Sequence, residues 1–109
     1  MLLSTTYELA GYEVTETIDI VRGSTVRARH VGRDIMAGFK NVVGGEIRSY
    51  TELMSDAREQ AIERMIADAD DLGADAVVGV RFMTASVMKG ASEILAFGTA
   101  VRIRKIEHV

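Results

Sequence analysis

The chain has 109 residues, a net charge of −3 and no cysteine, so we expect one domain (residues 1–109) without disulfides or thiolate metal ligands. No window holds the roughly 18 consecutive apolar residues of a membrane span, and the N-terminus lacks a signal-peptide pattern, which favours a cytoplasmic protein. The acidic total, with only three tyrosines and three phenylalanines, gives little support for nucleic-acid binding.

Residues 12–31 are predicted to form two strands. From Tyr12 to Val21, apolar and polar side chains alternate with a period of two, which is typical of a half-buried strand. Gly23 lies in the segment Arg-Gly-Ser-Thr, where a glycine favours a turn or a bulge. A second, more polar strand is predicted from Ser24 to Val31.

Two helices are predicted next. Apolar residues at helical spacing indicate a short helix from Arg33 to Val42, ended by two glycines. A long helix is predicted from Tyr50 to Leu72, because its apolar residues fall on one face. Ser49 and Glu52 form a capping box at its start, and Gly73 supplies the C-terminal cap.

Two strands joined by a turn are predicted in the last third of the chain. Residues 74–86 are too apolar for a solvated face, so we expect both sides of this strand to be covered. Gly90 marks a turn, and residues 94–105 form the final strand. The element order predicts an α+β fold, in which one long helix packs on a mostly antiparallel sheet.

The segment NVVGGEIRSYTEL, residues 41–53, combines two glycines, an arginine and a helix start. It does not fit a phosphate-binding loop or a dinucleotide-binding motif. A helix N-terminus beside Arg48 could hold an anion, but Ser49 and Glu52 already satisfy some of its donors. We therefore interpret the segment as a helix stop followed by a capped helix start.

The long helix carries a stripe of acids that lie within about 40° of one line: Glu52, Asp56, Glu59, Glu63 and Asp70. A solvated face is the first interpretation, contact with a basic strand of a neighbouring copy the second, and a metal site at Glu59 and Glu63 the third. Arg64 and Asp68, one turn apart, are candidates for an ion pair at an interface. The two histidines, His30 and His108, stand apart and predict no metal site.

Charge is unevenly distributed along the chain. Residues 22–48 hold six bases and two acids, whereas residues 49–75 hold eight acids and two bases. Such blocks fit a symmetric oligomer in which a basic segment of one copy meets an acidic segment of another. An apolar content of 48% in so short a chain also favours self-association.

Five motifs occur together and in order: LSTT at residues 3–6, GRDIMAGFKNVVGG at 32–45, SYTELMSDAREQAIERM at 49–65, LGADAVVGVRF at 72–82 and FGTAV at 97–101. Together they resemble the YbjQ-like family of small bacterial and archaeal proteins labelled as "putative heavy-metal-binding". The similarity covers nearly the whole chain.

The resemblance implies a subunit of the dodecin-like type that assembles as a ring, typically a homopentamer or a dimer of pentamers. It implies no established reaction and no known cofactor. The family's recurring polar residues are the candidate ligand contacts, namely Arg33, Asp34, Tyr50 and Arg58, with Ser4, Thr5 and Thr6 near the N-terminus. The alternative is structural: Arg33 and Asp34 would cap a helix, and Tyr50 would pack at an interface.

The function that we favour is a non-enzymatic homo-oligomer that can hold a small ligand or cation between subunits. Gly79 and Gly98, inside apolar strands, mark places where another backbone or a ligand could approach closely. Three alternatives stay open. They are a divalent-cation or heavy-metal binder that uses carboxylates, an enzyme with an inter-subunit site, and a purely structural ring held by Arg64 and Asp68.

Overall fold

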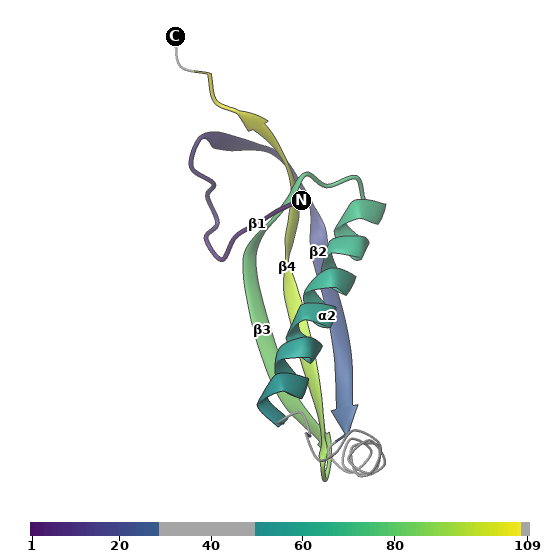
Figure 1. The fold of residues 1–109 in the computed structure, drawn as a ribbon. Helices are drawn as coiled ribbons and strands as arrows, with labels where there is room; N and C mark the ends of the chain where they lie inside the picture. Colours follow the sequence, from purple (N-terminus) through teal and green to yellow (C-terminus); the bar gives the residue numbers. More distant parts are fainter. Residues whose placement is uncertain (29–49, 108–109) are drawn as a thin grey trace, which may run out of the picture.

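The computed structural model describes residues 1–28 and 50–107, and shows one helix laid across one face of a four-stranded sheet (Figure 1). The predicted helix over residues 33–42 and the Ser49 cap lie outside the described residues. The elements are β1 (Leu2–Leu3), β2 (Tyr12–Ala28), α2 (Tyr50–Asp71), β3 (Ala76–Met88) and β4 (Ala91–Lys105). The predicted α+β class is confirmed.

The sheet has the strand order β1-β3-β4-β2. β4 lies between β3 and β2 and pairs antiparallel with both, which agrees with the predicted mostly antiparallel sheet. The two-residue strand β1, which sequence patterns did not predict, pairs parallel with β3 and makes the sheet mixed. β3 and β4 form a hairpin whose turn contains Gly90, at a φ of 79° that favours glycine.

Strand structure is confirmed from Tyr12 to Ala28, but the turn or bulge predicted at Gly23 is wrong. Residues 29–31, the end of the second predicted strand, lie outside the described residues. β2 runs without interruption from Tyr12 to Ala28 and stays paired with β4 across Gly23, which lies opposite Ala96. A Cβ atom on Gly23 would lie 2.3 Å from both the Ala61 carbonyl oxygen and the Met65 nitrogen. The glycine is therefore needed for the close approach of α2 to the strand, not for a turn.

The predicted long helix is confirmed, ending at Asp71 rather than Leu72. Gly73 follows it at a φ of 73°, as expected of a C-terminal glycine. The buried face consists of Ala57, Ala61, Met65 and Ala69, and the three alanines allow the helix to lie close to the sheet. Leu72, predicted on this face, is 39% exposed. Within the described ranges, no helix combines the length and apolarity needed to cross a membrane.

α2 packs mainly over β2 and β4 and touches β3 little (Figure 1). The core between the helix and the sheet includes Val21 from β2 and Ile94, Ala96 and Ala100 from β4. We call the opposite side of the sheet the outer face. One end of it carries a small second cluster, Ala76, Val78 and Val101, against which Leu9 of the N-terminal segment packs.

The prediction that β3 is covered on both sides holds for only part of the strand. Ala76, Val77, Val78 and Val80 are buried, but all residues from Arg81 to Met88 are exposed. The reason is geometric: α2 lies over the other two long strands, and the N-terminal segment reaches β3 only near its start. The chain is also extended, with a radius of gyration of 18.1 Å, against about 13 Å for a compact domain of this length.

Candidate functional site

The ligand contacts implied by the family resemblance are not brought together within the described residues. Arg33 and Asp34 lie outside those residues, and Tyr50 begins α2. Arg58 is exposed on the same helix, next to the buried Ala57. Their role as ligand contacts therefore stays a prediction.

Glu59 and Glu63 are both exposed on α2, one turn apart. No group of three or more histidine, cysteine or carboxylate side chains gathers to hold a metal ion in residues 1–28 and 50–107. Two carboxylates on one helix supply at most part of a metal coordination shell, because Mg²⁺, Ca²⁺ and Mn²⁺ take about six or more ligands.

The hydroxyl groups of Ser4 and Thr6 hold the N-terminal segment in shape. The Thr6 hydroxyl donates to the Glu8 carbonyl oxygen at 2.6 Å, and the Ser4 and Thr6 hydroxyl oxygens lie 2.6 Å apart. Because the single Thr6 hydroxyl proton is used on Glu8, Ser4 is the donor between them. The Thr6 backbone N–H in turn donates to Ser4 Oγ at 3.1 Å. These groups make a local turn, which favours the structural interpretation of the motif.

Arg81 and Tyr7 fasten this segment to β3. Arg81 Nη1 donates to the carbonyl oxygens of Thr5 and Val80, each at 2.8 Å, and its guanidinium carbon lies 5.7 Å from the centre of the Tyr7 ring. A Cβ on Gly79 would lie 2.6 Å from Tyr7 Cε1. The close approach predicted at Gly79 is thus made by an aromatic side chain of the same chain.

The other glycine singled out in an apolar strand, Gly98, also meets a neighbour within the chain. A Cβ there would lie 2.6 Å from Val77 Cγ1 and 3.0 Å from the Val78 carbonyl oxygen. Tight packing between β4 and β3 explains this glycine without a ligand.

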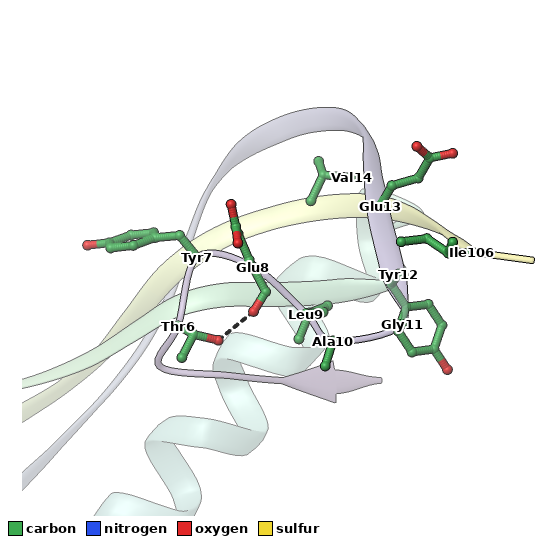
Figure 2. Close-up of a pocket in the computed structure, with 10 residues that line it drawn as sticks. All are labelled: Thr6, Tyr7, Glu8, Leu9, Ala10, Gly11, Tyr12, Glu13, Val14 and Ile106. Carbon is green, nitrogen blue, oxygen red and sulfur yellow. Dashed lines mark hydrogen bonds between the residues drawn. The ribbon is translucent and has the colours of Figure 1, made fainter. Parts of the chain in front are cut away.

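An open hollow of about 820 Å³ lies between the loop that precedes β2 and the end of the sheet (Figure 2). Leu9, Val14 and Ile106 contribute apolar side chains to it. Tyr7 and Tyr12 point away from each other, and Glu13 is engaged by the Arg104 guanidinium. The described residues that line the hollow therefore do not form a convergent set of acid, base and nucleophile of the kind that catalysis requires.

The predicted ion pair between Arg64 and Asp68 is wrong. Arg64 Nη1 donates to the Ser24 carbonyl oxygen, and Asp68 Oδ2 accepts from the Arg22 backbone N–H at 3.1 Å. Both side chains extend from α2 to β2, an edge strand of the sheet, and form hydrogen bonds with its backbone. They protect this edge from pairing with another chain.

Two regions of exposed apolar side chains stand out in the described part of the chain. The first is the far part of β3, where Phe82 (46%), Met83 (53%), Val87 (48%) and Met88 (67%) are exposed. The second is on the outer face, where Ile20 and Val26 of β2 are 64% and 53% exposed. Sequence reasoning missed both regions, although the uncharged run between Arg81 and Lys89 was a usable signal.

The fold defines a class of small α+β proteins in which one helix covers a mixed four-stranded sheet. It is similar to the crystal structure of a protein of unknown function from Pediococcus pentosaceus, with a TM-score of 0.58 and 18% sequence identity. The match covers 95% of this chain and 98% of that chain. At this identity, the likeness establishes the fold alone.

The sequence itself assigns the family. A family model described as "Putative heavy-metal-binding" matches residues 1–104, and the chain belongs to this family. Two similar relatives are both named UPF0145 proteins. The one from Pseudothermotoga lettingae is 59% identical over 106 residues, which cover 97% of this chain and 100% of the relative. The one from Halorubrum lacusprofundi is 60% identical over 104 residues, which cover 95% of this chain and 100% of the relative. The resemblance inferred from the sequence motifs is confirmed.

Proposed function

We propose that the protein is a non-enzymatic subunit of a homo-oligomeric ring, a homopentamer or a dimer of pentamers, which holds a small ligand or cation between subunits. The observation that carries the proposal is the uncovered outer face. Beyond the cluster around Leu9, its apolar side chains, such as Ile20 and Val26, are exposed and no element in residues 1–28 and 50–107 covers them.

Self-association would cover these exposed apolar side chains with a neighbouring copy of the chain. Large exposed apolar areas on soluble proteins mark interaction surfaces. An antiparallel sheet can leave one face in water, but the side chains on that face are then normally polar. Here α2 covers one face, whereas much of the other remains open. The extended shape of the subunit, 63 Å in its longest dimension, agrees with a protomer completed by its neighbours.

Native mass spectrometry of untagged protein, purified without added metal or chelator, tests the subunit number. We expect a mass of five or ten subunits, and a retained stoichiometric mass if a ligand is bound. Ile20→Lys should lower the subunit number, because a lysine ammonium cannot be buried without a partner. Ala67→Lys, on the exposed side of α2, is the matched control and should leave the assembly unchanged. A monomeric wild-type protein would refute the proposal.

Divalent-cation binding is the second candidate, favoured by the description of the family. Glu59 and Glu63 would contribute two oxygen ligands, and a neighbouring subunit would complete the shell. Glu59→Gln with Glu63→Gln should weaken Mn²⁺ binding in calorimetry by at least about tenfold without unfolding the protein. The control is Asp70→Asn with Asp71→Asn on the same helix. An equal loss in the control would mean diffuse charge attraction and would contradict the site.

A further inference from the structure

β3 presents an unpaired strand edge. One of its edges pairs with β4, and the other is bonded by the N-terminal segment only as far as Val80, whose N–H donates to the Ser4 carbonyl oxygen at 2.9 Å. From Arg81 to Met88, no described residue pairs with this second edge, and all eight residues are exposed. An edge of this kind leaves a row of backbone donors and acceptors available to another strand.

The two edges of the sheet differ in their protection. On β2, side chains of α2 occupy the backbone groups of Arg22 and Ser24, which discourages edge-to-edge pairing. Register shifts interrupt the ladders of both β2 and β3, so they do not distinguish the two edges. β3 has neither a charged residue nor a proline between Arg81 and Lys89. It is therefore the edge that is open to a partner.

The sequence of this edge is nearly symmetric about Ala85. It reads Phe82-Met83-Thr84-Ala85-Ser86-Val87-Met88, with two large apolar residues and one hydroxyl residue on each side of the alanine. We infer that β3 pairs antiparallel with β3 of a second copy, around a two-fold axis at Ala85. This inference rests on the proposed self-assembly and names one of its contacts.

The pairing matches like with like. Antiparallel strands related by this axis place Met83 opposite Val87 of the second copy, Thr84 opposite Ser86, and Ala85 opposite itself. Apolar pairs and hydroxyl pairs are both favourable across neighbouring strands. The ladder between β3 and β4 is regular from Arg81 to Ser86 and shifts register between Ser86 and Met88, so the strand is undistorted at the centre of the contact and irregular at its Val87 end.

The apolar area exposed on this edge is too small for a stable dimer by itself, so the contact needs further contacts elsewhere in the assembly. Four large side chains, three of them about half exposed and Met88 67% exposed, present roughly 400 Å² per copy if a fully exposed one has about 200 Å². A stable interface uses about 800 Å² per partner. The contact is thus too small for a tight isolated dimer, but large enough to join two rings through several copies at once.

The charged ends oppose the contact only weakly. The axis brings Arg81 of one copy near Lys89 of the other, which is a repulsive pair. Both residues are exposed, and Arg81 is directed to the Thr5 carbonyl oxygen, so water and salt reduce the repulsion.

A charge placed at residue 85 tests the two-fold axis directly. Ala85→Glu and Ala85→Lys each put two like charges side by side at the centre, and each should weaken the contact by at least about tenfold. Co-expression of the two variants, one isotopically labelled, should restore it, because Glu then faces Lys. Native mass spectrometry counts the subunits of each type. Ala67→Glu and Ala67→Lys on α2 are the controls and should change nothing.

The outcomes separate this contact from self-assembly as a whole. If wild-type protein is monomeric, the proposed function fails and this contact fails with it. If wild-type protein assembles but both single variants assemble equally well, only the two-fold contact is refuted. Loss in each variant without recovery on co-expression would place Ala85 against a different surface of the neighbour, and would also refute the two-fold axis.

Discussion

Replacing Gly23 with alanine is expected to cost about 3 kcal/mol of folding free energy, the upper end for adding a carbon atom to a packed core. The new Cβ would lie 2.3 Å from the carbonyl oxygen of Ala61 and 2.3 Å from the nitrogen of Met65. Both atoms belong to the backbone of α2, so no side-chain rotation can relieve the contact. The helix must move away from β2, which opens the core beneath it.

Urea unfolding at a fixed protein concentration measures this loss. Ser24→Ala is the matched control, because Ser24 neighbours Gly23 and accepts the Arg64 hydrogen bond through its backbone carbonyl oxygen. We expect the control to stay within about 0.5 kcal/mol of wild type. If Gly23→Ala were as stable as Ser24→Ala, the close approach of helix and strand would be wrong.

Met65→Ala is expected to cost about 2–5 kcal/mol, the usual range for removing a fully buried large side chain. Met65 is 0% exposed and belongs to the core that joins α2 to the sheet. The loss has two parts, the transfer free energy of the removed atoms and the cavity that they leave. The small residues around it, including Ala61 and Ala69, cannot fill that cavity.

Leu72→Ala provides the comparison for Met65→Ala. Leu72 directly follows α2 and is 39% exposed, so its truncation should cost less than about 1 kcal/mol. Both variants must be unfolded at the same protein concentration, because the proposed self-association would add to the apparent stability. Equal losses in the two variants would show that the helix does not pack through Met65.

The elements that the sequence predicted well are those set by local rules. The helix from Tyr50 to Asp71 follows from apolar residues repeating at helical spacing, and Gly73 ends it because that position needs a positive φ. The β3–β4 hairpin follows from two apolar runs separated by a turn at Gly90. Residues close in sequence determine these features, so they can be predicted without knowledge of the rest of the fold.

Predictions failed where a distant part of the chain decided the outcome. Gly23 indicated a turn on local rules, yet its role is to admit a helix that begins 27 residues later. Arg64 and Asp68 have the spacing of an ion pair, but each bonds to the backbone of β2, which needed a donor and an acceptor at its edge. Spacing along a helix does not reveal which outside group competes for a side chain.

The same division applies to the candidate sites. The sequence by itself determined the family, the helix with its exposed carboxylates at Glu59 and Glu63, and the apolar character of β3. Only the tertiary structure decided which apolar residues stay uncovered. α2 packs over β2 and β4, so the residues from Arg81 to Met88 are exposed despite a composition typical of a buried strand. Burial depends on where the layers lie, and that is a property of the whole chain.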